Sequence, residues 1–100
     1  MAFNRAGLFS DGANAGLPGT RSWAYITTDA LTVVRAADYF LSAIQELSLG
    51  DYIRVIIVGG TITAPTSLTS VNHTYVNAKN TATPTIDVVD GVAVTGTDTD

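Results

Sequence analysis

The sequence predicts an α+β protein that is mainly β, a small antiparallel β-sandwich or barrel with one or two short helices at about 29–48 and an irregular N-terminal arm. Two observations predict this class. Residues 22–28 and 71–78 alternate in side-chain character and are rich in β-branched and aromatic residues, as strands are. Asp90-Gly91 separates two further β-branched runs, which is the strongest short-range signal for a β-hairpin.

The chain divides into an extended arm at 1–20 and a single β-rich domain at 21–100. The arm contains four glycines and Pro18, and it shows neither a helical nor an alternating period. Its large apolar side chains are unusual for a solvated tail, so we expect them to dock on their own domain or on a neighbouring chain. These side chains are Phe3, Leu8, Phe9 and Leu17.

The helices are expected between the first strand and the longest apolar run. Asp29 directly follows the strand and can cap a helix by accepting hydrogen bonds from backbone N–H groups. A second helical segment is indicated by apolar residues at i, i+3 and i+4 spacing. This stripe consists of Tyr39, Phe40 and Leu41 with Ile44 and either Leu47 or Ser48.

A buried strand is expected at 52–58. Gly50 is suited to end the preceding helix with a positive φ, and Gly59-Gly60 indicates a turn or a bulge. The run between them is almost continuously apolar, which predicts burial on both faces of the strand. We expect the core to form around Gly50-Asp51 from Trp23, Tyr25, Phe40, Leu47, Ile53, Val55 and Ile57.

Composition narrows the possible functions. The net charge of −4, with only five Lys and Arg residues, argues against a nucleic-acid binder. Charged residues make up 14% of the chain, below the usual share of about 25%. A surface with so little charge is suited to burial in an assembly. Because the chain has no cysteine, disulfides and thiolate metal sites are excluded, and oligomerisation is one way to support a small core.

No membrane or secretory segment is expected. The N-terminal residues lack a long apolar stretch of the kind found in signal peptides, and the apolar run at 55–58 is far too short to cross a bilayer. The sequon at 72–74 is therefore interpreted as accidental. We expect a chain that is made in the cytoplasm.

The sequence contains no arrangement typical of an enzyme. His73 is the single histidine, and we expect it to face solvent or a subunit contact from the middle of a strand. Asp29, Asp38 and Asp51 all stand at the starts of elements, where caps and turns explain them. We therefore expect no catalytic residue, no metal and no cofactor. A small hydrolase that uses His73 is a weaker alternative.

One segment resembles a known family. Its residues are Trp23-x-Tyr25-x-Thr27-x-Asp29, Ala37-Asp38-Tyr39-Phe40 and Leu47-x-x-Gly50-Asp51-x-Ile53-x-Val55. The segment resembles small virion proteins of tailed bacteriophages, in particular the head decoration (cement) proteins. Tyr75-Val76 and a terminal hairpin fit the same pattern, so that the resemblance spans about residues 23–95.

The resemblance implies a bacteriophage structural protein on the capsid surface, made in the host cytoplasm and without enzymatic activity. Its implied partners are copies of itself, as a homotrimer, and the major capsid protein, with no nucleic acid and no membrane. The arm residues expected to contact the capsid or another subunit are Phe3, Arg5, Leu8, Phe9 and Leu17. The residues of the structural motif are Trp23, Tyr25, Asp29, Tyr39, Phe40, Gly50 and Asp51.

The main alternative is a tail-fibre or head-fibre module that binds a host receptor or a glycan. Sugar-binding sites place an aromatic ring in an open groove beside polar groups that fix orientation. A glycan site in this chain would therefore show Trp23 or a tyrosine in an open groove beside an Asn or Asp side chain.

Overall fold

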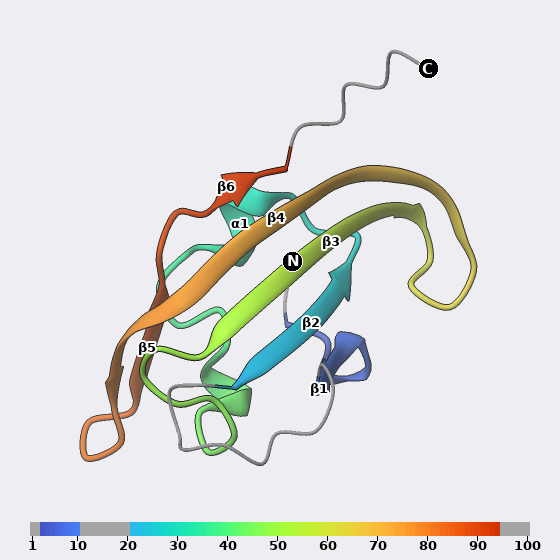
Figure 1. Cartoon of the computed structure of the whole chain (residues 1–100). Coiled ribbons are helices and arrows are strands. Elements are labelled where there is room, and N and C mark those ends of the chain that lie inside the picture. The colour runs from blue at the N-terminus through green and yellow to red at the C-terminus, as the bar shows by residue number, and fades with distance from the viewer. Residues whose placement is uncertain (1–2, 11–20, 95–100) are drawn as a thin grey trace.

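The computed structural model describes residues 3–10 and 21–94. In this part of the chain, six strands form one sheet in the order β1-β2-β3-β4-β5, with β6 also paired to β4 (Figure 1). The strands are β1 (Leu8–Ser10), β2 (Ser22–Thr27), β3 (Tyr52–Gly60), β4 (Pro65–Asn80), β5 (Thr85–Val88) and β6 (Val92–Ala93). The helical elements are η1 (Arg5–Gly7), α1 (Leu31–Val34) and η2 (Leu41–Ala43). The predicted α+β, mainly β class is confirmed.

The sheet is mixed, because β2 and β3 run in parallel. Trp23 lies opposite Ile53 and Tyr25 opposite Val55, while the other strand pairs are antiparallel. Parallel neighbours need a crossover connection, and the stretch that holds α1 and η2 supplies it. The architecture is therefore a single mixed sheet covered by this crossover, and the predicted antiparallel sandwich or barrel is wrong.

The core lies between the crossover and one face of the sheet. Val34 of α1 and Ala43 of η2 belong to the same buried cluster as Tyr25 and Val55 of the sheet. Trp23 is partly buried and packs against this cluster. The other predicted core side chains are all buried, and they are Tyr25, Phe40, Leu47, Ile53, Val55 and Ile57. The predicted core is thus confirmed.

Residues 3–10 of the predicted arm belong to this fold. β1 pairs with β2, with Leu8 opposite Tyr25, and the Phe3 ring stacks on the Tyr25 ring at a centroid distance of 5.4 Å. Gly7 allows this close approach, because a Cβ atom there would lie 2.2 Å from the carbonyl oxygen of Ile26. This part of the arm therefore docks on its own domain, and Leu17 lies outside the described residues.

β3 and β4 form a long hairpin that extends past the rest of the sheet (Figure 1). Its register shifts between Gly59 and Gly60, which confirms the predicted turn or bulge. Pro65 is the first residue of β4 and lies opposite Gly60. Proline is tolerated as the first residue of a strand, where its missing N–H group costs no ladder hydrogen bond.

The predicted hairpin at Asp90-Gly91 is wrong. β5 and β6 do not pair with each other, since both pair with β4. They follow one another along the same edge of β4, with Lys79 opposite Ile86 and His73 opposite Val92. Gly91 does have a positive φ, of 88°. It serves as a kink in one interrupted edge strand, because the 16-residue β4 is long enough to pair with both pieces.

Candidate functional site

The face of the sheet opposite the core forms the candidate site, and we call it the outer face. Burial alternates along β3, where Ile53 and Val55 are buried but Tyr52, Arg54 and Ile56 are partly exposed. The expectation that 52–58 is buried on both faces is therefore wrong within one chain. The helical crossover supplies a single layer, so it covers only one side of the strand.

One row of side chains crosses the whole outer face. The pairing registers align five residues, one on each of β1, β2, β3, β4 and β6, because residues directly opposite one another point to the same side of a sheet. The row is Phe9, Ala24, Arg54, His73 and Val92. Its two ends are strongly exposed, with Phe9 at 57% and Val92 at 71% of full accessibility.

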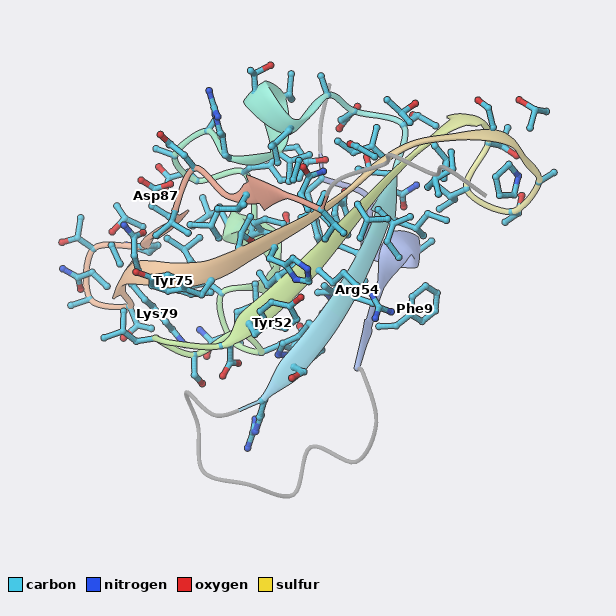
Figure 2. All side chains as sticks on the ribbon, turned by 45° about the horizontal axis from the view of Figure 1, so that its top comes forward. Phe9, Tyr52, Arg54, Tyr75, Lys79 and Asp87 are labelled. Carbon is cyan, nitrogen blue, oxygen red and sulfur yellow. The ribbon has the colours of Figure 1, made fainter. Side chains whose placement is uncertain are left out.

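The neighbouring rows are also largely apolar or aromatic. On one side Ser22 lies opposite Tyr52, which lies opposite Tyr75, and Tyr75 is 51% exposed. On the other side a row consists of Ile26, Ile56 and Val71. Figure 2 shows Phe9, Tyr52, Arg54 and Tyr75 on β1, β3 and β4. A sheet face that is in contact with water normally carries polar residues. An apolar outer face therefore indicates a contact surface.

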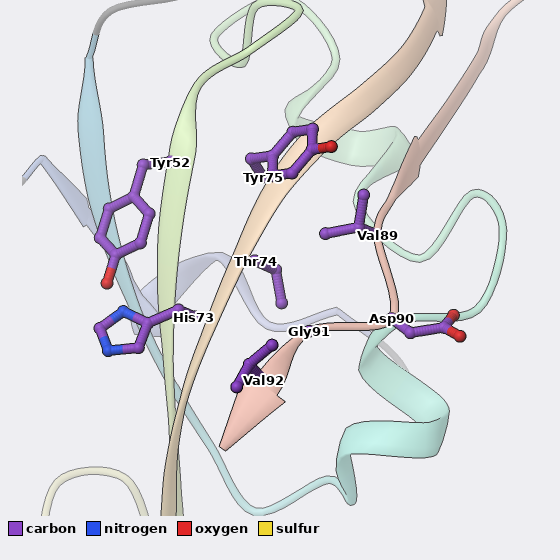
Figure 3. Close-up of a pocket in the computed structure, with 8 residues that line it drawn as sticks. All are labelled: Tyr52, His73, Thr74, Tyr75, Val89, Asp90, Gly91 and Val92. Carbon is purple, nitrogen blue, oxygen red and sulfur yellow. The ribbon is translucent and has the colours of Figure 1, made fainter. Parts of the chain in front are cut away.

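A pocket of about 480 Å³ lies at the β4 side of the outer face (Figure 3). It is lined by side chains of β3 and β4 and by the kink between β5 and β6. The Tyr52 and His73 rings stack at its side with a centroid distance of 5.3 Å. The residues that form most of its wall are Tyr52, His73, Tyr75, Val89, Gly91 and Val92.

The kink at Gly91 creates this pocket. Val89 still donates a backbone hydrogen bond to Tyr75, and Val92 is again paired with His73. Between these two points the edge strand is interrupted. A Cβ atom at Gly91 would lie 2.8 Å from Cγ2 of Thr74, so this course of the chain depends on glycine.

The pocket offers little polar chemistry. The Asp90 side chain points away from the rings of Tyr52 and Tyr75 (Figure 3). His73 stacks on Tyr52, and within residues 3–10 and 21–94 no group of three or more His, Cys, Asp or Glu side chains could hold a metal ion. The walls of the pocket are suited to binding an apolar side chain rather than to holding a reacting group.

The motif residues from the first half of the chain meet in the core. The Tyr39 hydroxyl donates to Oδ2 of Asp29 at 2.6 Å, and it lies 2.8 Å from the Tyr25 hydroxyl. The Tyr25 hydroxyl in turn accepts a hydrogen bond from the backbone N–H of Asn4. Burial, together with the hydrogen bond to Asp29, raises the pKa of Tyr39 well above its usual value. This network connects residues 3–10, β2 and the crossover.

The predicted capping role of Asp29 is wrong. The N-cap of α1 is Ala30, which makes no side-chain hydrogen bond. The Asp29 carboxylate is 4% exposed and accepts the Tyr39 hydroxyl instead. The helix spans only Leu31–Val34, so a cap there would stabilise little.

Asp51 has the predicted turn role and a further one. Its Oδ2 accepts the backbone N–H of Ser48 at 3.0 Å, and it also accepts the Trp23 indole N–H at 3.1 Å. Gly50 beside it has the expected positive φ, at 93°. The carboxylate is fully buried, so it joins the crossover to β2 rather than facing a cleft.

The predicted arm contacts separate into two groups. Phe3 and Leu8 pack against the core of their own chain, and Arg5 forms an ion pair with Glu46. Phe9 lies on the outer face and is largely exposed. His73 is exposed on the same face, as expected of a strand histidine that faces solvent or a subunit contact. Sequence reasoning missed the other outer-face residues, although the apolar residues at both odd and even positions of β3 were a signal for them.

No protein family, curated protein or solved structure matches this chain. Within the described part of the chain, no helix has the length and apolar character needed to cross a membrane. The outer face and its pocket are therefore interpreted from their own geometry.

Proposed function

We propose that this chain is a structural, non-enzymatic virion protein of a bacteriophage, which binds the capsid surface as an oligomeric decoration (cement) protein and stabilises the head. The observation that carries the proposal is the outer face, a broad apolar surface with Arg54 as the one formal charge of its central row. The resemblance of the motif at 23–55 supports the assignment to a phage particle.

The physical case for an assembly role rests on the cost of exposing this face. Phe9, Tyr75 and Val92 are each more than half exposed. Large exposed apolar patches mark contact sites, and burying them stabilises an assembly by about 25 cal/mol per Å² of apolar surface removed from water. The proposed partners are further copies of the chain, as a homotrimer, and the major capsid protein.

A fibre module that binds a receptor or glycan is the second candidate. The observation in its favour is that Tyr52 and Tyr75 line an open pocket beside Asp90. The direction of the Asp90 side chain counts against it, because a sugar site needs polar groups that point at the ligand (Figure 3). Titration of soluble glycans into the parent chain and into Tyr75→Ala distinguishes the two candidates.

Capsid binding tests the main proposal. Purified protein is mixed with capsids that lack it, and the bound fraction is measured by co-sedimentation. We expect the parent chain to bind and Ile56→Asp to lose binding, because it places a charge in the centre of the outer face. Thr83→Asp, in the exposed turn between β4 and β5, is the matched control and should bind normally. Equal binding of Ile56→Asp, with its fold verified by circular dichroism, contradicts the proposal.

A further inference from the structure

We propose that Phe9 of one copy of this chain occupies the outer-face pocket of a second copy. The contact deepens the oligomeric part of the proposed function, since it names the surface through which copies join. It needs no capsid, so it can be tested on the purified chain alone.

Phe9 has the properties of an anchor residue. It is the exposed end of the central row, on the edge strand β1, and its ring is 57% exposed. β1 itself is held firmly, because Leu8 packs against the core and Gly7 is buried under β2. A large aromatic ring on a fixed backbone loses little conformational freedom when it binds.

The pocket has matching properties. Tyr52, His73 and Tyr75 offer ring surfaces and Val92 an aliphatic one, and the pocket of about 480 Å³ has room for an aromatic side chain. Aromatic pairs at stacking or edge-on distances add to the gain from burial. The occupant that these walls favour is therefore an apolar ring without charge.

A second copy is the occupant because one face carries both halves of the contact. Phe9 stands at one end of the row and Val92, at the rim of the pocket, stands at the other. The two are four strand spacings apart, about 19 Å at roughly 4.8 Å per spacing, so Phe9 cannot reach the pocket of its own chain. If one copy is rotated so that its Phe9 meets the Val92 end of the row in the next copy, symmetry repeats the same contact in every copy.

The size of the outer face indicates how strong a contact between copies should be. Three aligned rows across four or five strands cover about 20 Å by 15 Å, on the order of 300 Å² in projection before side-chain relief is added. Stable interfaces bury about 800 Å² per partner. The outer face alone provides less than this area, so we expect a reversible association that depends on protein concentration.

Engineered cysteines provide the direct test, because the chain has none of its own. The double variant Phe9→Cys/Val92→Cys is oxidised mildly and run on a non-reducing gel. We expect covalent dimers or closed trimers, since only cysteines of different copies can meet the Cα distance of about 4.4–6.8 Å that a disulfide needs. A dimer or a trimer supports the contact, and a dimer would contradict only the proposed homotrimer. Because Phe9→Cys also removes the ring, the oxidation is run at a concentration where sedimentation equilibrium shows the double variant to be associated. Monomers alone under these conditions overturn the contact.

Two controls separate a specific bridge from random collision. Phe9→Cys by itself places no cysteine among the pocket residues, and Phe9→Cys/Thr83→Cys places its second cysteine in the turn between β4 and β5. We expect both controls to stay monomeric on the same time scale. Cross-linking of these controls as fast as of the Val92 pair also overturns the proposal.

Self-association without cross-links gives a second measurement. Phe9→Thr keeps a β-forming residue on β1 but removes the ring, and we expect it to weaken association by about 10- to 100-fold in sedimentation equilibrium. Phe9→Leu should restore most of the affinity. An unchanged mass for Phe9→Thr, or a monomeric parent chain at high concentration, contradicts the contact even if the protein still binds capsids.

Discussion

The Tyr39 hydroxyl and the Asp29 carboxylate form a 2.6 Å hydrogen bond next to the core. Tyr39 belongs to the crossover and Asp29 follows β2, so the bond joins the sheet to the layer that covers it. Since Asp29 is almost fully buried, its oxygen depends on this donor in place of water.

Tyr39→Phe should destabilise the protein by roughly 1–3 kcal/mol, because it removes the donor but leaves the buried carboxylate in place. Urea unfolding measures the change. Asp29→Ala/Tyr39→Phe should cost less than the sum of the two single variants, since the two residues share one interaction. Additive losses would show that the bond contributes little.

Stability should fall as the pH rises above about 10. The folded state raises the pKa of Tyr39, while the unfolded chain has the ordinary value of 10.0. Above that value the unfolded chain releases the Tyr39 proton and the folded protein retains it, so alkali favours unfolding. Below it the contribution is fully present. Thermal unfolding from pH 8 to 11 measures this slope, and Tyr39→Phe should have a shallower one.

Asp51→Asn should retain more stability than Asp51→Ala. The amide oxygen of Asn can still accept the Ser48 N–H or the Trp23 indole, whereas Ala leaves both donors without this partner and should cost roughly 1–3 kcal/mol. Trp23 fluorescence during denaturant unfolding measures the stability of both variants. Equal losses would indicate that the carboxylate charge, rather than hydrogen-bond acceptance, is what the site requires.

Leu47→Ala should destabilise the fold by about 2–5 kcal/mol, because Leu47 is fully buried in the core and its loss leaves a cavity. Leu49→Ala is a matched control two residues away, where the side chain is 59% exposed. We expect it to change the free energy of unfolding by less than about 0.5 kcal/mol. Similar losses in both variants would contradict the assigned core.

The sequence alone determined the strands at 22–28 and 71–78, the bulge at Gly59-Gly60 and most of the core. These features depend on local periodicity and on single glycines, which act over a few residues. It also indicated, through the apolar run at 52–58, that β3 is suited to burial on both faces. The structure buries one of them within the chain.

Only the tertiary structure decided which residues become partners. Asp29 accepts Tyr39 instead of capping a helix, because the crossover places the hydroxyl beside it. Asp90-Gly91 kinks an edge strand instead of closing a hairpin, because β4 offers backbone groups to both β5 and β6. The alignment of Phe9 with Val92 follows from four pairing registers between distant segments, and no local pattern contains that information.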